Sequence, residues 1–185
     1  RSKPQLDSRL AGSRLPNILL ILTDDLGWRD LSCYGSTFYE TPNIDRLASQ
    51  GMRFTDAYAA ANVCSPTRAA VLTGKTPARL HLTDFLSGLD FPHAALSPPD
   101  WTRWYLPHKE VTLAEMLKPA GYETFYFGKW HLGYEPRFNP MRHGWDAFFG
   151  YLGGNVHYFN HRELSDLHVL FRGRLPVHAE GYMTR

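Results

Sequence analysis

Cysteine is scarce in this chain, whose 185 residues include only Cys33 and Cys64. Two cysteines form at most one disulfide, so the fold does not depend on a disulfide framework. The sequence also lacks any Asn-x-Ser/Thr glycosylation site. Cysteine usage is therefore compatible with either a reducing or an oxidising compartment.

Two further absences exclude classes of partner. No apolar run approaches the roughly 20 residues that a membrane-spanning helix needs, so we expect no membrane span. The formal net charge is only +2, with 20 basic and 18 acidic residues interspersed along the chain. This balance argues against a polyanion-binding surface, and we expect no nucleic-acid partner.

The pattern of apolar residues predicts an α/β fold with a largely parallel central sheet flanked by helices. The strongest signal is the continuous apolar run 18–22, which is typical of a strand buried on both faces. Residues 1–15 are expected to form a flexible tail, and residues 16–185 the folded part. The other predicted elements are helices near 42–50, 66–73 and 111–118, strands at 52–58 and 122–127 (the latter also buried), and a short strand pair or helix at 164–175. Long loops are predicted at 75–109 and 132–160, and loops of this length are often functional.

Chemically reactive residues follow the two buried strands. Asp24 and Asp25 come directly after the first strand, and Lys129 and His131 come after the second. Ligands of such sheets bind beyond the carboxyl ends of the strands. We therefore expect these side chains and the segment around Cys64 to meet at one edge of the sheet.

Cys64 is followed by a Ser-Pro pair and, at i+4, by Arg68. Ser65 is a good N-cap and Pro66 a good first helical residue. Cys64 is thus expected at a helix N-terminus, near its partial positive charge, with Arg68 on the same face. Such a sulfur is reactive or faces an anion. The alternatives are a structural cysteine or a disulfide with Cys33.

The other residues also have two interpretations each. Asp24 and Asp25 offer hard oxygen ligands for Ca²⁺ or Mg²⁺, or else one of them caps a turn. Lys129 and His131, two residues apart at a strand end, can face one ligand, or else lie in a solvated loop. Arg68 contacts an anionic site, or else forms a salt bridge on the surface of a helix.

Four segments together resemble the sulfatase family. Cys-Ser-Pro-Thr-Arg at 64–68, continued by small and apolar residues and Thr-Gly, resembles the first sulfatase signature. Residues 121–131, which end in Gly-Lys-Trp-His, resemble the second signature. Thr-Asp-Asp-Leu-Gly-Trp at 23–28 is similar to the first metal-binding segment of the family, and residues 143–151 also look like sulfatase sequence.

The resemblance implies an alkaline-phosphatase-like fold and hydrolysis of a sulfate monoester of a sugar or aryl alcohol. A formylglycine-generating enzyme would convert Cys64 to formylglycine. One hydroxyl of the hydrated aldehyde attacks sulfur, and the second later expels sulfate. Asp24, Asp25 and the formylglycine would bind a divalent cation, Ca²⁺ or alternatively Mg²⁺.

The resemblance also implies roles for individual side chains. Arg68 would hold the formylglycine, Lys129 would contact both the sulfate and the formylglycine, and His131 would bind the formylglycine hydroxyl. Lys129 and His131 would thus contact substrate as well. His143 and Asn155 are further candidates for substrate contacts. Two other histidines lie in the same variable loop, namely His157 and His161.

The resemblance covers roughly residues 16–160, and family members are far longer. The metal and sulfate ligands that they supply from later segments are not found here, so we expect an incomplete catalytic domain. Phe127 stands where the family usually has a smaller residue. The alternatives are a phosphonate monoester or phosphodiester hydrolase of the same superfamily, and an inactive fragment that only binds partners. By analogy, the expected location is periplasmic, secreted or lysosomal.

Overall fold

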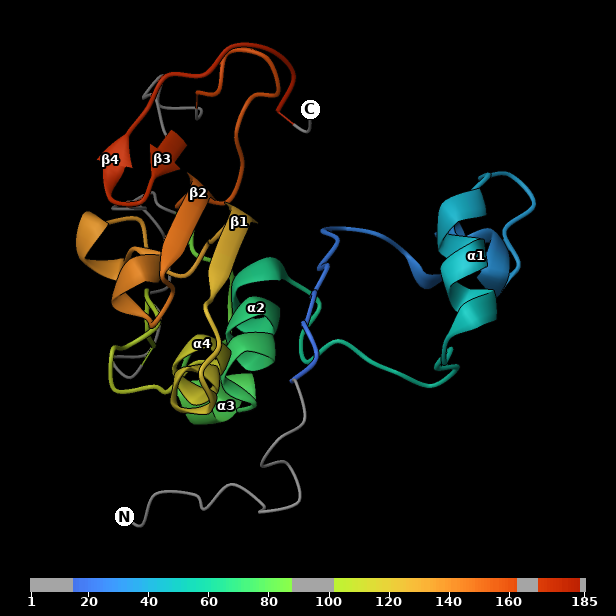
Figure 1. Ribbon diagram of the computed structural model, residues 1–185, viewed down its shortest axis with the longest axis horizontal. Coiled ribbons are helices and arrows are strands. Elements are labelled where there is room, and N and C mark those ends of the chain that lie inside the picture. Colours follow the sequence, from blue (N-terminus) through green and yellow to red (C-terminus); the bar gives the residue numbers. More distant parts are fainter. Residues whose placement is uncertain (1–14, 88–101, 163–169, 184–185) are drawn as a thin grey trace, which may run out of the picture. The chain divides into compact units, whose positions relative to one another are not determined.

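A computed structural model describes residues 15–87, 102–162 and 170–183 (Figure 1). The chain forms two compact units, residues 1–58 and 59–185, which are described separately below. The predicted tail lies outside the described residues, except for Leu15. Across the described ranges, no helix is both long and apolar enough to cross a membrane.

From residue 15 onward, the first unit contains two 3₁₀ helices and one α-helix, namely η2 (Trp28–Asp30), η3 (Ser32–Tyr34) and α1 (Pro42–Gln50). The capping signals place α1 correctly, with Thr41 at the N-cap, Pro42 in the first turn and Gly51 after the last residue. The Asp45 carboxylate accepts hydrogen bonds from the Thr41 hydroxyl (3.1 Å) and the Cys33 N–H (2.9 Å). Asp45 thereby ties η3 to the first turn of α1.

The buried strand predicted at 18–22 is wrong for this structure. Residues 18–22 form no strand, and their side chains are between 42% and 84% exposed. Hydrophobicity indicates that a segment favours burial, but a strand also needs a neighbouring strand to accept and donate its backbone hydrogen bonds. Within the described part of the chain, this run has no strand partner.

The strand predicted at 52–58 is also wrong. Its residues form bends, and side-chain hydrogen bonds hold this segment instead of a backbone ladder. The Tyr34 hydroxyl donates to the Phe54 carbonyl at 2.6 Å, and the Arg53 guanidinium donates to the Cys33 carbonyl. These two hydrogen bonds connect the segment to η3.

The described residues of the second unit form three α-helices, of which α4 shows the predicted capping. The Thr112 hydroxyl accepts from the Glu115 N–H at 3.4 Å, and the Glu115 carboxylate accepts from the Thr112 N–H at 2.9 Å. The helices are α2 (Cys64–Thr73), α3 (Pro77–Leu80) and α4 (Leu113–Leu117), with 3₁₀ helices η4 (Lys118–Ala120), η5 (Pro136–Phe138) and η6 (Pro140–Arg142).

A mixed four-stranded sheet lies beside these helices, in the order β1-β2-β3-β4 (Figure 1). The strands are β1 (Phe125–Lys129), β2 (Ala147–Tyr151), β3 (Leu170–Arg172) and β4 (Leu175–Pro176). β1 and β2 are parallel, whereas the β2–β3 and β3–β4 pairs are antiparallel. The α/β prediction and the strand-pair alternative at 164–175 are confirmed for the described residues. β2 lies inside a predicted loop and was missed.

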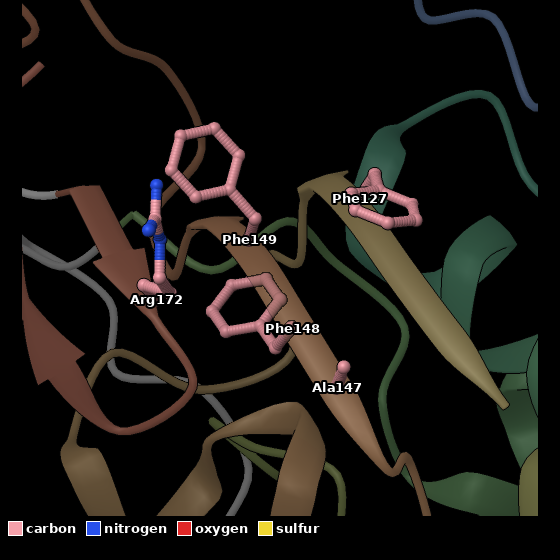
Figure 2. A pocket seen from close by; sticks show the side chains of 5 residues that line it. All are labelled: Phe127, Ala147, Phe148, Phe149 and Arg172. Atoms are coloured by element: carbon pink, nitrogen blue, oxygen red, sulfur yellow. The ribbon is translucent and has the colours of Figure 1, made fainter.

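The predicted strand at 122–127 exists as β1, but it starts three residues later and is buried on one face only. Tyr126 packs against the core, while Phe125 and Phe127 are exposed. On the exposed face, the Arg172 guanidinium lies 5.8 Å from the centre of the Phe149 ring (Figure 2). The core on the other side is formed by Ala69, Leu72, Leu80, Leu82, Leu106, Trp130, Leu132, Phe148 and Leu152.

Two glycines pair across β1 and β2 and allow a very close approach of their backbones. Gly128 is the register partner of Gly150. A Cβ atom added to Gly150 would lie 2.0 Å from the Gly128 carbonyl oxygen. Gly128 itself has φ +97°, a conformation that other residues rarely adopt. This pair fixes the path of β1 immediately before Lys129.

We predict that Gly150→Ala destabilises the full-length protein by about 1–3 kcal/mol, because the added methyl group overpacks against backbone. Gly51→Ala is the matched control, since its Cβ would meet the Leu47 carbonyl oxygen at an ordinary 3.4 Å. Thermal unfolding of the three proteins measures the effect. Equal melting temperatures for Gly150→Ala and the parent protein would contradict the close-packing account.

Candidate functional site

The N-terminal turn of α2 carries Cys64 as its first residue. Val63, not Ser65, is the N-cap, so the helix starts earlier than its capping signal predicts. The reason is that the Ser65 hydroxyl instead accepts a tertiary hydrogen bond from the Leu86 N–H at 3.0 Å. Cys64 is partly exposed and carries a free thiol, as does Cys33. The position of Cys64 at a helix N-terminus is confirmed, and no disulfide joins the two cysteines in this structure.

Arg68 joins α2 to the end of β1. Its buried guanidinium donates a hydrogen bond to the Lys129 carbonyl at 2.6 Å and lies 3.4 Å from the Tyr126 hydroxyl. The Tyr126 hydroxyl also donates to the Lys129 carbonyl, at 2.7 Å. Arg68 is therefore not a surface arginine. Through it, the helical turn that bears Cys64 meets the strand end that bears Lys129.

His131 lies buried in a constrained position two residues after β1. Its φ of +56° places it in the left-handed region, which is uncommon outside glycine and frequent at functional sites. Its Nε2 atom lies 2.6 Å from the Leu86 carbonyl oxygen. A carbonyl only accepts hydrogen bonds, so Nε2 bears the proton in this arrangement.

Leu86 and Tyr134 complete the support of His131. The Tyr134 hydroxyl donates to the Leu86 carbonyl at 3.1 Å and accepts from the Gly154 N–H at 3.1 Å. Gly154 lies against the His131 ring, and a Cβ atom there would be 2.8 Å from Nε2. The Leu86 peptide thus bridges Ser65 in α2 and His131. Sequence reasoning missed this role, although Leu86 lies in the segment 75–109 predicted to be a functional loop.

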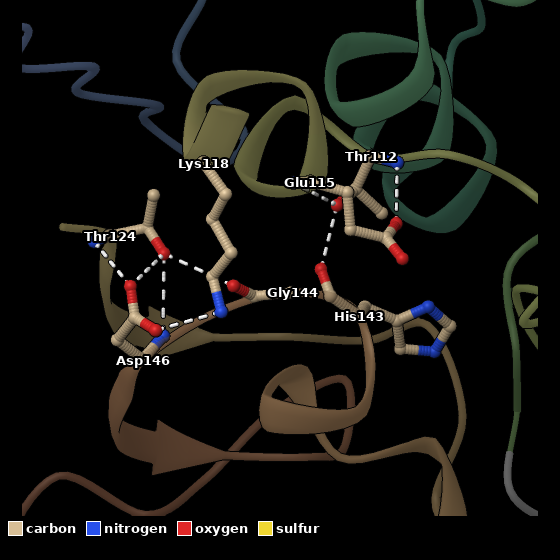
Figure 3. Close-up of polar contacts among 7 residues, drawn as sticks. All are labelled: Thr112, Glu115, Lys118, Thr124, His143, Gly144 and Asp146. Carbon is tan, nitrogen blue, oxygen red and sulfur yellow. Dashed lines mark hydrogen bonds and ion pairs between the residues drawn. The ribbon is translucent and has the colours of Figure 1, made fainter. Parts of the chain in front are cut away.

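His143 is a core residue. It is 1% exposed, and its ring stacks against the His108 ring at 4.8 Å and packs against the Trp130 ring at 5.4 Å. Its carbonyl accepts a hydrogen bond from the Thr112 hydroxyl at 2.6 Å (Figure 3). Burial, with a smaller contribution from the charge of His108, lowers the pKa of His143 from 6.5 to about 4. This environment favours a packing role over the predicted substrate contact.

Asp146 anchors the turn that follows His143. Its carboxylate forms an ion pair with the Lys118 ammonium at 2.7 Å and accepts hydrogen bonds from the Thr124 N–H (2.9 Å) and hydroxyl (3.0 Å) (Figure 3). The hydrogen bond with Lys118, and then those with Thr124, hold the pKa of the Asp146 carboxyl below its usual 3.8. Through these contacts, residues 143–146 link β2 to α4, η4 and the start of β1.

The three polar candidates in the loop after β2 differ in exposure. Asn155 is exposed, and its contact with substrate stays a prediction. His157 is also exposed, and its Nδ1 atom accepts from the N–H groups of Phe159 (3.2 Å) and Asn160 (3.3 Å). His161 is buried, with Nδ1 at 2.9 Å from the Ala179 carbonyl oxygen. The two histidines shape the loop in which they lie.

The predicted metal ligands belong to the first unit. Asp24 and Asp25 are exposed, and Asp25 has φ +55°. Their adjacent carboxylates suit a hard cation, but they supply at most four of the roughly six to eight oxygens that Ca²⁺ takes. No group of three or more His, Cys, Asp or Glu side chains placed to hold a metal occurs in the described residues. The pair therefore fits part of a metal site.

Within the second unit, the structure brings a helix N-terminus and Cys64 to a strand end that carries Lys129, with His131 held nearby. Such a junction can bind an anion, because helical N–H groups, a guanidinium and an ammonium all favour negative charge. A fixed imidazole adds a group for proton transfer. The chemistry suited to it is attack by residue 64 on an anionic ester.

Comparison with known proteins identifies the family of this chain. Residues 16–174 match the family model Sulfatase. N-acetylgalactosamine-6-sulfatase of Sus scrofa is 48% identical over 135 residues, which make up 73% of this chain and 25% of that protein. The chain thus spans about a quarter of the length of the curated relative that it matches.

Solved structures agree with the sequence relatives. "Ps i-CgsB" superposes with a TM-score of 0.76 at 31% identity, covering 92% of this chain and 39% of the other. The same protein "in complex with k-i-k-neocarrahexaose" gives a TM-score of 0.71 at 29% identity, with coverages of 87% and 37%. These neighbours are sulfatases of alkaline-phosphatase-like fold, so the predicted fold class is confirmed.

We predict that His143→Phe flattens the pH dependence of stability between pH 6.5 and about 4. The folded-state pKa of His143 lies near 4, below its ordinary 6.5, so the unfolded state takes up a proton more readily in this window. The stability contribution of the neutral ring is complete above pH 6.5 and is lost as the pH falls toward 4. Chemical denaturation of the full-length protein at several pH values measures the slope.

Asp146→Asn is the control for this prediction. The pKa of the Asp146 carboxyl lies below 3.8, so its contribution is lost only at lower pH. That variant should be less stable throughout, with an unchanged slope between pH 6.5 and 4. An unchanged slope in His143→Phe would show that His143 does not titrate as its environment indicates.

Proposed function

Because the chain belongs to the sulfatase family, we propose that the full-length protein hydrolyses a sulfate monoester of a carbohydrate or aryl alcohol. The observation that supports this most is the hydrogen bond from the Arg68 guanidinium to the Lys129 carbonyl. It joins the helical turn of Cys64 to the strand end of Lys129. A sulfate bound at this junction would meet positive charge from several directions.

Position 64 suits a nucleophile that attacks an anion. It is partly exposed in the first turn of α2, where unpaired N–H groups and the helix dipole stabilise negative charge. Formylglycine at this position would supply a hydrated aldehyde, which offers one hydroxyl for attack on sulfur and another for release of sulfate. Arg68, one turn along the helix, would offset negative charge beside residue 64.

Lys129 and His131 would act on substrate and protons respectively. Lys129 is the last residue of β1 and is half-exposed, so its ammonium group would stabilise the charge that builds up on the sulfate oxygens. The Leu86 carbonyl keeps a proton on Nε2 of His131. Nδ1 is then the basic ring nitrogen, suited to exchange a proton with a hydroxyl of residue 64.

Asp24 and Asp25 would hold the divalent cation, together with residue 64 and ligands from the remainder of the protein. Bound Ca²⁺ would polarise the sulfate oxygens and keep the nucleophile oriented. This part of the proposal is supported by the resemblance of residues 23–28 to the first metal-binding segment of the family, whose model matches residues 16–174.

We predict that the peptide containing Cys64, isolated from the full-length protein of the native host, carries an aldehyde in place of the thiol. Mass spectrometry of that peptide measures the conversion. Cys64→Ala should lower turnover of an aryl sulfate by at least about 10³-fold, because it removes the nucleophile. Cys33→Ala should retain activity, since the Cys33 backbone groups that bind Asp45 and Arg53 are kept by the substitution.

Two outcomes would contradict this assignment. An intact Cys64 thiol in active enzyme would eliminate the aldehyde mechanism. Faster turnover of an aryl phosphodiester than of an aryl sulfate would instead identify a phosphodiester hydrolase of the same superfamily.

We further predict that Asp24→Asn raises the Ca²⁺ concentration needed for half-maximal activity by at least about tenfold, because one charged ligand oxygen is lost. Asp56→Asn is the matched control, since Asp56 is also an exposed carboxylate of the first unit but lies outside the segment 23–28 that resembles a metal-binding motif. Activity titrated with Ca²⁺ after chelator treatment measures both variants. Equal Ca²⁺ requirements for Asp24→Asn and the parent protein would remove Asp24 from the metal site.

A further inference from the structure

Three aromatic rings gather on the surface beyond β2, outside the site described above. Tyr158 and Tyr182 stack nearly parallel, with centroids 5.3 Å apart and planes inclined by 14°. Phe159 meets Tyr182 at 5.2 Å in an edge arrangement. The three side chains are between 41% and 67% exposed. We call Tyr158, Phe159 and Tyr182 the aromatic platform.

The platform rests on a loop that internal hydrogen bonds hold in shape. The His157 N–H donates to the Arg162 carbonyl at 2.9 Å, and the His161 N–H donates to the His157 carbonyl at 3.0 Å. The Met183 N–H donates to the Tyr158 carbonyl at 2.8 Å, which docks the segment carrying Tyr182 on this loop. Rings held in this way lose little conformational freedom when a ligand binds.

The loop starts at the candidate active site. The Leu152 carbonyl accepts the His131 N–H at 3.0 Å, and Gly154 lies against the His131 ring. Tyr158 is the fourth residue after Gly154, so their Cα atoms are at most about 14 Å apart. A substrate of a few sugar units, bound with its sulfate near His131, would have a length sufficient to reach the aromatic platform.

The chemistry of the platform favours a sugar ring. A pyranose offers one apolar face of C–H groups and a polar rim, and exposed tyrosine rings match both through their faces and hydroxyls. The near-neutral chain argues against nucleic acid, which would need an excess of basic residues. The neighbour that superposes over 87% of this chain was solved with a neocarrahexaose, a ligand of several sugar units.

We infer that the aromatic platform is a saccharide subsite, which binds a sugar unit of the substrate remote from the sulfate ester to be cleaved. This inference rests on the proposed function, because it assigns the platform to the same substrate. It makes the enzyme selective for sulfated oligosaccharides over small sulfate esters. The rings bind but do not take part in the chemical step.

The test uses the full-length enzyme and its Tyr182→Ala variant, with Tyr182→Phe as the matched control that keeps the ring. Substrates are an aryl sulfate and sulfated hexasaccharides from chondroitin 6-sulfate and carrageenan. We expect Tyr182→Ala to raise KM for the hydrolysed hexasaccharide by about five- to tenfold. Its kcat/KM for the aryl sulfate and its melting temperature should stay unchanged, and Tyr182→Phe should match the parent enzyme.

A second measurement separates this inference from the proposed function. Chemically desulfated hexasaccharides cannot be hydrolysed, so their binding, followed by NMR of the enzyme, reports the platform alone. Binding that is weakened by Tyr182→Ala supports the subsite even if no sulfate ester is cleaved. Absence of such binding, an equal loss on aryl sulfate and hexasaccharide, or a lower melting temperature for Tyr182→Ala would each overturn the inference. In the last case, the rings serve packing.

Discussion

The candidate site depends on one buried hydrogen bond, from the Arg68 guanidinium to the carbonyl of Lys129. A buried guanidinium is costly unless its donors are satisfied, so the bond restricts where α2 lies relative to the end of β1. Cys64 is one turn before Arg68 on the same helix, and Lys129 is the residue whose carbonyl accepts the bond. This contact thus joins the helical turn that bears Cys64 to the strand end that bears Lys129.

A second set of contacts determines where His131 lies, and it involves backbone rather than side chains. The Leu86 peptide donates to Ser65 in α2 and accepts from His131, so the helix and the imidazole share one support. Gly154 allows the loop after β2 to pass directly against the ring. The left-handed backbone of His131 is tolerated because these neighbours over-determine its position.

The sequence predicted those parts that depend on local chemistry. The capping residues of α1 and α4 and the helical start at Cys64 follow from nearby residues. The meeting of the Cys64 segment with the end of β1 follows instead from the rule that ligands bind beyond the carboxyl ends of strands. The run 18–22 was predicted to be a buried strand from its hydrophobicity alone. That prediction failed because hydrophobicity indicates a preference for burial but does not identify a neighbouring strand. The roles of Ser65, Leu86 and Tyr134 depend on tertiary hydrogen bonds, which leave no pattern in the chain. His143 shows a further limit, because the motif it belongs to did not indicate that its ring lies in the core against His108 and Trp130.

The central claim is the proposal that residue 64, Lys129 and His131 bind the sulfate group of the substrate, and that Asp24, Asp25 and residue 64 hold a divalent cation. The most direct test is a crystal structure of the full-length protein with Ca²⁺ and inorganic sulfate. The account predicts one sulfate within hydrogen-bond distance of residue 64, Lys129 and His131, beside a calcium ion held by Asp24 and Asp25. A calcium ion remote from residue 64, or a sulfate that contacts neither Lys129 nor His131, would contradict it.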